Sequence, residues 1–574
     1  MSSTTKPVGQ EVGENTSLLR PNDETVDDQS SMTLSGDEEE LLDTDKSNQH
    51  VGRGRGLLIA LSVWALIFLQ ASNMSGITTT QSKIAEDLDA FDSASWFTSS
   101  YLIAMSSFSP LVARLAQIFS PRDCMFVSSF IFAIGGLLTS QAPDLKVFLL
   151  GRVVSGLAAA GIMTISFILV LELSGKKRRG LIIGLLNTCF TMGVSLGAVI
   201  AGALLKGFGW RFLFWVQSPL AILAGFAIFF AIPKSFTSGH KSTAEFSISQ
   251  KLARIDYLGA FLLTSSLILF LLGMSWPKIL WLPIGISVPL ILAFIFVEIY
   301  VASEPIIPVT VLKSRGALLS CIAQLGIMSA RWMVLFYTPT YAIAVLGWSP
   351  ASAGTILIPT NVGFATGGIL VGWLHIKKSR SYWLASILSF TLFALTLLIL
   401  SQISNNSTPP PLYYFVVFLN GLFTGAALNY TLSHLLHLTP PATHFITISL
   451  LNTFRGFAGS FGTAIGSGFF VRVLKRTLET GFEKTVGLEG REDLVRRLLG
   501  SPALVQNLEG VEKDIAMKGY MAGLNALFLA GVGVAVVMVF VQSGTGWIAP
   551  GDEKDDERGE REVLIEESIG EEGL

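Results

Sequence analysis

The sequence predicts an all-α membrane protein with about fourteen transmembrane helices. Three observations carry this prediction: apolar stretches each long enough to cross a bilayer, short connections between them, and positive charge that alternates from one connection to the next. A transmembrane helix needs roughly 20 mostly apolar residues, because every backbone N–H and C=O must be satisfied within the helix. The 574 residues are 51% hydrophobic and 14% charged, a balance foreign to a water-soluble domain.

The apolar stretches place the predicted spans along the chain. They begin near Leu57, Ser93, Asp123, Lys146, Gly180, Gly209, Ile255, Ile279, Leu318, Ala351, Tyr382, Leu412, His444 and Tyr520. An even number of crossings puts both chain ends on one side of the membrane.

The short loops decide which side that is. One set is rich in basic residues: Arg53, Arg55, Arg122, Lys176, Lys177, Arg178, Arg179, Lys234, Lys241, Lys251, Arg254, Lys313, Arg315, Lys377, Lys378 and Arg380. The opposite short loops contain only Lys83, Lys146, Lys206, Arg211 and Lys278. Because positive loops stay in the cytosol, we expect both tails to be cytosolic.

These positions predict the following organisation. We expect a disordered acidic tail over 1–56, a six-helix bundle over 57–232, a linker with two extra helices over 233–315, a second six-helix bundle over 316–545, and an acidic cytosolic tail over 546–574. The second bundle includes a long non-cytosolic loop, 472–519, in which Glu492 to Leu499 is an amphipathic helix candidate.

Two short patterns lie outside the spans. Glu14, Leu18 and Leu19 form a pattern that resembles the acidic dileucine signals read by sorting adaptors; a functional signal and an idle pair of leucines both stay open. Asn405 and Asn406 begin two overlapping glycosylation patterns on the non-cytosolic side, where chance occurrence is the favoured explanation.

Charged residues inside the spans are the first functional candidates. Arg152, Arg331 and Arg455 each lie well inside a span, where a charge costs about 2.5 to 3.5 kcal/mol on insertion scales. Arginine stays protonated, so these residues supply fixed positive charge. We expect Arg331 and Arg455 to hold anionic groups of a substrate in a cavity shaped by Asn73 and Asn361.

A structural role for the same arginines is the alternative. In that case they bond to helix-end carbonyls or to polar neighbours such as Asn187, Gln217, Gln324, Asn361 and Asn429. Glu172, at a cytosolic helix end, is a titratable candidate that pairs with Arg114 or Lys176, either as a gate or as a surface contact.

Glycines recur at four-residue spacing within several spans. The pairs are Gly193 and Gly197, Gly363 and Gly367, Gly421 and Gly425, and Gly462 and Gly466. Small residues at this spacing let two helix backbones approach closely in lipid.

Several motifs together resemble the major facilitator superfamily and, within it, the fourteen-helix drug:proton antiporter branch common in fungi. The motifs are Gly151-Arg152-Val153-Val154-Ser155-Gly156, the segment Gly209 to Pro219, Asp256-Tyr257-Leu258-Gly259, and Tyr337-Thr338-Pro339-Thr340-Tyr341. The resemblance implies two six-helix bundles around a central pocket with two extra central helices. It also implies a part in proton coupling for Arg152. Glu172, the titratable candidate near the cytosolic end, is a second residue that we expect to take part in proton coupling.

This sequence departs from the family pattern at three places. Asn73 stands where helix 1 usually has an aspartate. The gating loop with Arg114, Gln117 and Arg122 lacks the usual first glycine and the aspartate, and Ala198 replaces the proline of the antiporter motif.

The tail segment 14–21 resembles the N-terminal signals of vacuolar basic amino acid transporters of the same branch. We therefore expect a proton-coupled carrier of amino acids into the vacuole. The alternatives are multidrug or secondary-metabolite efflux at the plasma membrane, and a transport-deficient nutrient receptor. A cluster of arginines favours a carboxylate-bearing or zwitterionic substrate over a basic one.

No nucleotide-binding loop, nucleophile triad or metal cluster is visible in the sequence, so we expect neither enzyme activity nor a cofactor. The expected partners are a small-molecule substrate, protons, lipid and a sorting adaptor, without nucleic acid, and we expect a monomer.

Overall fold

The computed structural model describes residues 53–173, 179–232, 256–275, 279–302, 314–376, 381–439, 444–485, 487 and 489–546. Its helices are α2 (Arg53–Asp87), η1 (Phe91–Ser93), α3 (Trp96–Ile118), α4 (Pro121–Ser140), α5 (Leu145–Leu173), α6 (Arg179–Ala231), α8 (Tyr257–Ser275), α9 (Trp281–Tyr300), α11 (Arg315–Ala344), α12 (Pro350–Gly354), α13 (Leu357–Leu370), η3 (Val371–His375), α14 (Trp383–Ile403), α15 (Pro410–His437), α16 (His444–Thr485), α17 (Glu492–Gly500), η5 (Pro502–Asn507) and α18 (Gly510–Ser543). The described residues are therefore helical, as the sequence predicts.

Twelve of these helices are long and apolar enough to cross a membrane, within the described residues. One of them, α6, contains two helices that meet at Gly209, where φ is 75° and the backbone is not helical. Its 53 residues would measure about 80 Å if straight, far more than the roughly 30 Å of a bilayer core. Glycine adopts the left-handed conformation of this bend at no steric cost.

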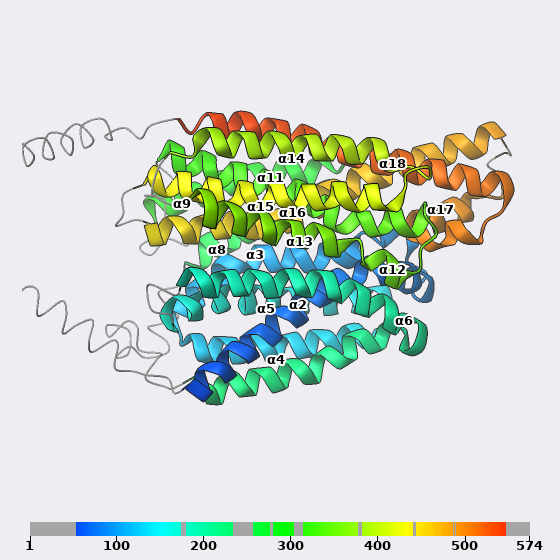
Figure 1. Cartoon of the computed structure of the whole chain (residues 1–574). Helices are drawn as coiled ribbons and strands as arrows, with labels where there is room; N and C mark the ends of the chain where they lie inside the picture. Colours follow the sequence, from blue (N-terminus) through cyan, green and yellow to red (C-terminus); the bar gives the residue numbers. More distant parts are fainter. Residues whose placement is uncertain are drawn as a thin grey trace, which may run out of the picture. The chain divides into compact units, whose positions relative to one another are not determined.

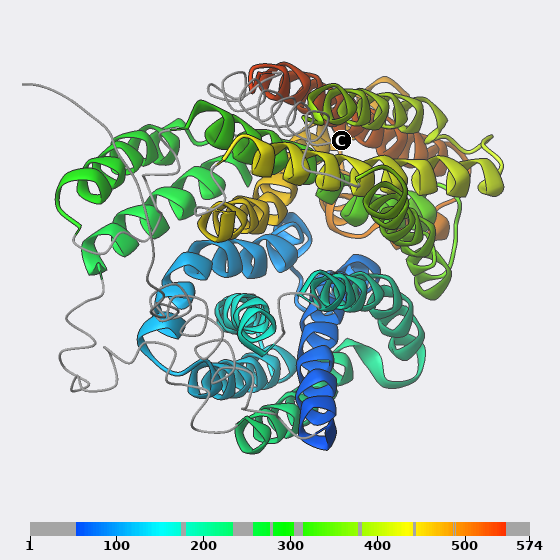
Figure 2. The same ribbon diagram turned by 60° about the vertical axis from the view of Figure 1, so that its left-hand side comes forward.

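The long helices of residues Arg55–Leu574, which form one compact unit, pack in two groups (Figures 1 and 2). In the first group, α2–α6, helix α5 packs against α3 and α4, and α4 packs against α6. In the second group, α11–α18, helix α11 packs against α16 and α18, and α14 against α15 and α18. The hairpin of α8 and α9 joins the bundle through α8, which contacts both α3 and α16.

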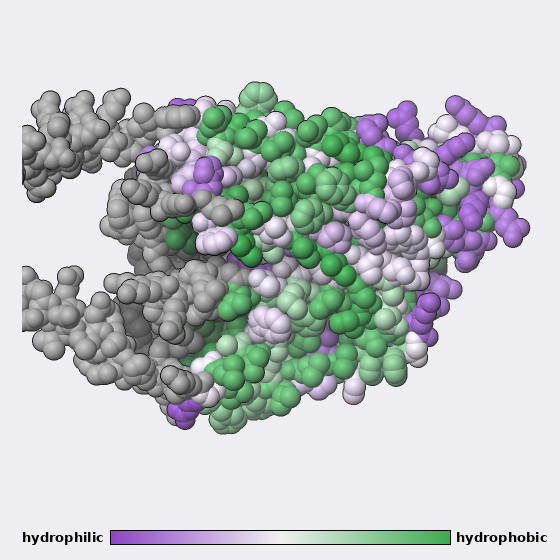
Figure 3. Space-filling view, viewed as in Figure 1, coloured by the Kyte–Doolittle hydropathy of each residue, from purple (hydrophilic) through white to green (hydrophobic). Residues whose placement is uncertain are grey.

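Many large hydrophobic side chains are exposed on the long helices, as a lipid-facing protein requires. Figure 3 shows an apolar surface across the middle of the unit and hydrophilic residues gathered at the end that contains α17. Exposed residues such as Phe230, Trp281 and Phe540 lie on the apolar surface. Hydrophobic residues outside the core are stable there because lipid replaces water as the solvent.

The paired glycines of α13 and α15 produce the close helix contact that their spacing predicts. A Cβ atom on Gly421 would lie 1.9 Å from the carbonyl oxygen of Thr360, and one on Gly363 would lie 2.1 Å from the carbonyl oxygen of Phe418. Because both obstacles are backbone atoms, only glycine allows the two helices to approach this closely.

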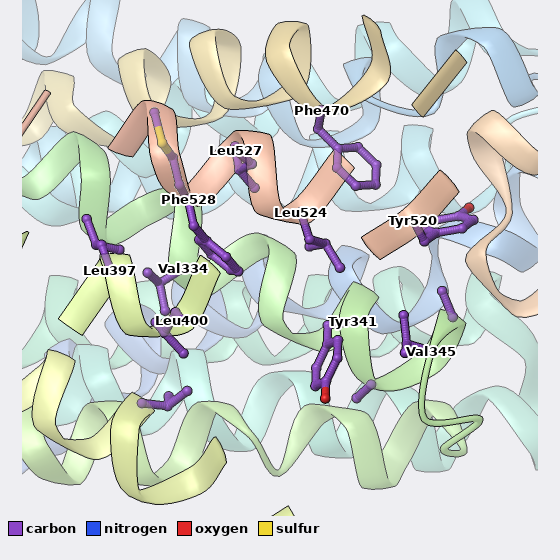
Figure 4. Close-up of a cluster of buried hydrophobic side chains, with 14 of the residues drawn as sticks. Val334, Tyr341, Val345, Leu397, Leu400, Phe470, Tyr520, Leu524, Leu527 and Phe528 are labelled. Atoms are coloured by element: carbon purple, nitrogen blue, oxygen red, sulfur yellow. The ribbon is translucent and has the colours of Figure 1, made fainter. Parts of the chain in front are cut away.

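The second group is held by a large cluster of buried hydrophobic residues. Val334 of α11, Leu397 of α14, Phe470 of α16 and Leu524 of α18 belong to it, and Figure 4 shows how these helices contribute side chains to the same interior. This cluster fixes the helices that contribute Arg331 and Arg455.

The loop expected over residues 472–519 is shorter in the structure than the sequence predicts. Helix α16 continues to Thr485, and α18 begins at Gly510, ten residues before the expected Tyr520. The reason is a four-residue spacing of Leu474, Leu478 and Phe482, which buries one face of the extended α16 in the same cluster as Ile515 of α18. The amphipathic candidate Glu492 to Leu499 is confirmed as a helix, α17.

Candidate functional site

Arg152 lies fully buried in the first group, on α5. Its Nε donates to the carbonyl oxygen of Phe97 at 2.8 Å, and its Nη1 donates to Oδ1 of Asn73. Asn73 in turn donates from Nδ2 to Oε1 of Gln217 at 2.7 Å, so α2, α5 and α6 share one polar network. The guanidinium also lies 4.5 Å from the ring centre of Tyr101, a cation–π contact.

One donor of this network is left over. Within the described residues, Nη2 of Arg152 is buried and has no hydrogen-bond partner. Asn73, which accepts from Arg152, and Gln217, which accepts from Asn73, are both neutral. Within the described residues, the positive charge of Arg152 is therefore stabilised by dipoles and an aromatic ring instead of a carboxylate.

Arg331 lies on α11 and reaches the contact between the two groups. Its Nη1 donates to Oγ1 of Thr360 at 3.2 Å and its Nη2 to Oδ1 of Asn361 at 3.0 Å. Asn361 donates from Nδ2 to Oγ of Ser195 on α6 at 2.7 Å. This chain of contacts connects a buried cation of the second group to the first group.

Arg455 on α16 makes a second connection of the same kind. Its Nη2 donates to Oδ1 of Asn187 at 3.3 Å, and Asn187 lies on α6 eight residues before Ser195. The positive charge of Arg455 also acts on Arg331, so the two cations repel each other. Two like charges bonded to neutral groups form a place where an anion is stabilised.

Close packing joins the two groups further along α6. A Cβ atom on Gly202 would lie 2.5 Å from the backbone nitrogen of Ala351, and one on Gly354 would lie 2.8 Å from the carbonyl carbon of Ala198. One stripe of α6, from Asn187 to Gly202, therefore carries both polar contacts and close packing with the second group.

A cavity of about 50 Å³ lies between the groups. Hydroxyl groups line it from both groups, among them those of Thr78, Thr98 and Ser99 from the first and Thr340 and Thr463 from the second. It has room for a few water molecules. Arg152, Arg331 and Arg455 do not line this cavity. This cavity was not predicted from the sequence, although the runs Thr78-Thr79-Thr80 and Thr98-Ser99-Ser100 are an unusual density of hydroxyl groups for apolar helices.

The structure separates the predicted residues into two arginine sites. It brings Asn73 to Arg152 and Asn361 to Arg331, whereas Arg455 bonds Asn187. Of the polar neighbours expected for a structural role, Asn187 bonds Arg455 and Asn361 bonds Arg331, whereas Gln217 bonds Asn73 instead of an arginine. The contacts of Ser195, Thr360 and the Phe97 carbonyl were not predicted.

Among the expected gating residues, only the side chain of Arg122 is described. Arg122 is buried in the first turn of α4, and its guanidinium lies 4.0 Å from the ring centre of Phe229 on α6. Arg114 and Gln117 belong to α3, and Glu172 belongs to α5, but their side chains lie outside the described residues. Their gating and coupling roles stay predictions.

Of the two patterns outside the spans, the structure describes the glycosylation pattern but not the dileucine pattern. Glu14, Leu18 and Leu19 lie outside the described residues. Oδ1 of Asn405 accepts from the backbone and hydroxyl of Ser407 and from Oγ1 of Thr408, whereas Asn406 is exposed. Of the two predicted glycosylation sites, Asn406 has the more accessible side chain.

Metal chemistry has no visible centre in the described residues. Within them, no three His, Cys, Asp or Glu side chains gather closely enough to hold an ion. Cys189 and Cys321 are buried, and Cys124 is half-buried. The arrangement is suited to binding an anionic group and to holding two helix groups together.

Comparison with known proteins identifies related chains along most of the length. A family model described as Major Facilitator Superfamily matches residues 63–463. Multidrug resistance protein fnx1 of Schizosaccharomyces pombe is 25% identical over 478 residues, which cover 81% of this chain and 88% of that protein. The MFS thioclapurine efflux transporter tcpA of Claviceps purpurea is 24% identical over 516 residues, which cover 88% and 92%.

Solved structures show the same fold. A bacterial homolog of the human lysosomal transporter Spinster, in an inward-facing and unoccupied conformation, superposes with a TM-score of 0.58 at 14% identity, covering 86% of this chain and 97% of that one. The human organic anion transporter MFSD10 superposes with a TM-score of 0.51 at 13% identity, covering 84% and 99%.

Proposed function

Because the chain belongs to the major facilitator superfamily, we propose that it is a secondary carrier that moves carboxylate-bearing or zwitterionic small molecules out of the cytosol by alternating access. The observation that carries this proposal is a pair of cations, the buried Arg331 and the half-buried Arg455. Arg455 donates to Asn187 on α6 of the other helix group, and Arg331 reaches Ser195 on α6 through Asn361. A substrate carboxylate that replaces Asn361 and Asn187 as the acceptors of these arginines would couple binding to the contact between the groups.

Efflux of a drug or secondary metabolite is the candidate that we favour. It is supported by the two fungal relatives described above, one described by multidrug resistance and the other by thioclapurine efflux. Uptake of amino acids into the vacuole is the second candidate, favoured by the tail pattern of Glu14, Leu18 and Leu19. Both candidates carry solute in the same direction, from the cytosol to the opposite face.

The proposed topology has fourteen crossings with cytosolic tails. The two helices within α6 count separately on either side of Gly209, and α3, with 23 residues, is long enough to cross although it is absent from the twelve most apolar helices. In this arrangement α8 and α9 are the two extra helices between two six-helix bundles, and α17 lies on the non-cytosolic side.

Proton coupling is part of the proposal. Arg152 holds a fixed charge beside Asn73, which cannot exchange a proton at physiological pH, so the titrating group is expected elsewhere. Glu172 on α5 is the proposed carrier of that proton.

Reconstitution tests the carrier and its substrate class directly. Proteoliposomes with an imposed pH gradient are supplied with organic acids, amino acids and cationic dyes, and uptake is measured with and without the gradient. We expect uptake of carboxylate-bearing compounds and stimulation by the gradient. Transport restricted to cationic dyes would contradict the proposed substrate class, and absence of transport throughout would favour a receptor.

The site is tested by Arg455→Ala. We expect this variant to be expressed at the normal level and to lose transport, because the substrate anion loses its partner. Arg476→Ala is the matched control, since Arg476 lies exposed on the same helix, α16. Full transport by Arg455→Ala would remove Arg455 from the site.

Location separates the two candidates. A fluorescent fusion on the vacuolar rim that moves to the plasma membrane in Leu18→Ala/Leu19→Ala supports amino acid storage. A fusion at the plasma membrane in both forms supports efflux.

A further inference from the structure

Helix α17 reaches from the second helix group to the first. Arg496 on α17 donates from Nε to Oδ2 of Asp92 at 2.8 Å and from Nη2 to Oδ1 of Asp89 at 3.1 Å. The same Nη2 bonds the carbonyl oxygen of Asp89 at 3.0 Å. Asp89 and Asp92 belong to the short connection between α2 and α3, so one arginine joins segments about 400 residues apart along the chain.

Asp89 adopts a conformation that fits this contact. Its φ is 44°, and it is the one non-glycine residue with positive φ in the described part of the chain. The left-handed region costs a non-glycine residue free energy, so it persists where neighbouring contacts favour it. Here both the carbonyl and the carboxylate of Asp89 bond Arg496.

The backbone of α17 also lies close to the backbone of η1. A Cβ atom on Gly500, at the end of α17, would lie 2.5 Å from Cα of Phe91 in η1. The carbonyl oxygen of Gly500 accepts from Nε2 of Gln81 at 3.4 Å, and the backbone nitrogen of Ala503 donates to Oγ of Ser82 at 3.4 Å. The contact therefore involves the whole segment α17–η5.

The other side of α17–η5 is fixed in the second group. Val495, Leu498 and Val505 are buried in the large hydrophobic cluster. Tyr520 of α18 donates its hydroxyl to the carbonyl oxygen of Leu498 at 2.5 Å, and Gln506 donates from Nε2 to the carbonyl oxygen of Ala344 at 3.0 Å. Segment α17–η5 is thus anchored to the second group and only touches the first.

This segment also lines the cavity between the groups. Leu499 and Pro502 of α17–η5 line it together with Gln81 of α2 and Tyr520 of α18. The segment that Arg496 joins to the first group therefore forms part of the cavity wall at this end.

We propose that α17–η5 is a latch, which holds the α17 end of the two helix groups closed through Arg496, Asp89 and Asp92 and releases it when these contacts part. The latch is suited to repeated opening. The side chains of Arg496, Asp92 and Asp89 are 35%, 59% and 77% exposed, so each ion pair is partly solvated and individually weak.

Thiol labelling tests the latch without any transport substrate. The three native cysteines are replaced by alanine, and Ser99→Cys is introduced in the cavity. Ser99 is a suitable reporter because, within the described residues, its buried hydroxyl has no hydrogen-bond partner to lose. A membrane-impermeant methanethiosulfonate is added outside proteoliposomes. In a separate variant, Asn406→Cys, exposed at the same end of the bundle, reports the fraction of molecules inserted with this end toward the outside of the vesicle.

We expect Arg496→Ala and Asp92→Asn each to raise the labelling rate of the reporter at least about threefold, the scale of a lost partly exposed ion pair. The matched control is Arg497→Ala, because Arg497 pairs with Asp493 on its own helix and should leave the rate unchanged. Exchanging the charges, with Asp92→Arg and Arg496→Asp together, should return the rate toward that of the parent. Equal labelling of the parent, Arg496→Ala and Asp92→Asn would overturn the latch.

A reversible crosslink adds a transport readout that rests on the proposed function. Asp92→Cys and Arg496→Cys are bridged by a cleavable bifunctional methanethiosulfonate. Transport should stop in the bridged protein and return with reductant, and continued transport in the bridged protein would overturn the latch. Loss of transport in the unbridged parent would count against the proposed carrier, while the labelling result would still decide the latch.

Discussion

Asn361 donates from Nδ2 to Oγ of Ser195 at 2.7 Å, and this bond joins α13 of the second helix group to α6 of the first. The same Asn361 accepts from Arg331 through Oδ1. Asn361, a neutral side chain, therefore links the buried cation Arg331 to the other helix group.

Ser195→Ala should weaken the described arrangement of the two groups. It leaves Nδ2 of Asn361 without its acceptor, a loss of about 1 to 3 kcal/mol for a buried donor, and so shifts the population by about fivefold or more toward other arrangements. Double electron–electron resonance between labels at the exposed residues Phe208 and Asn406 measures this population. Ser166→Ala is the control, because the Ser166 hydroxyl bonds Ile162 of its own helix. Equal changes in both variants would argue against the role of Ser195.

Asn73→Ala should destabilise the first helix group. It removes the acceptor of Arg152 and the donor to Gln217, and we expect a loss of about 2 to 4 kcal/mol in unfolding free energy for these two buried groups. Thermal unfolding in detergent provides the measurement. Asn73→Asp keeps an acceptor for Arg152 and adds an opposite charge, so its loss should be smaller. A melting temperature that is lower in Asn73→Asp than in Asn73→Ala would contradict this account of Arg152.

Gly421→Ala should disrupt the contact of α13 and α15. The added methyl group would overlap the Thr360 carbonyl, and a backbone obstacle yields only if a helix moves, at a cost of about 1 to 3 kcal/mol or more. Expression level and melting temperature should both fall. Gly533→Ala on α18 is the control, since a methyl group there meets nothing within 4 Å. Normal stability of Gly421→Ala would mean that these helices pack less closely than described.

Glycosylation should depend on Asn406 rather than Asn405. The Asn405 side chain is occupied by Ser407 and Thr408, whereas Asn406 is exposed. In a host that adds glycans, Asn406→Gln should abolish a glycosidase-sensitive gel shift and Asn405→Gln should keep it. A shift that survives only in Asn406→Gln would reverse the assignment, and no shift in the parent would show that the pattern is a chance match.

The sequence by itself determined the local features of this protein. Apolar stretches gave the helices, Gly209 marked a boundary between two of them, and the amphipathic pattern after Arg491 gave α17. These predictions succeed because hydrophobicity, periodicity and backbone freedom act over a few neighbouring residues. The four-residue spacing of Leu474, Leu478 and Phe482 also predicts a helix, although the charged residues between them favoured the prediction of a loop.

The tertiary structure alone decided which partners meet. Asn361 and Ser195 are 166 residues apart, and Arg455 and Asn187 are 268 residues apart. Several amide side chains were candidate partners for each arginine, and the choice among them depends on how far each helix is rotated and how closely its neighbours pack. The same reason applies to Arg496, whose charge is visible in the sequence but whose partners are selected by the position of α17 against η1.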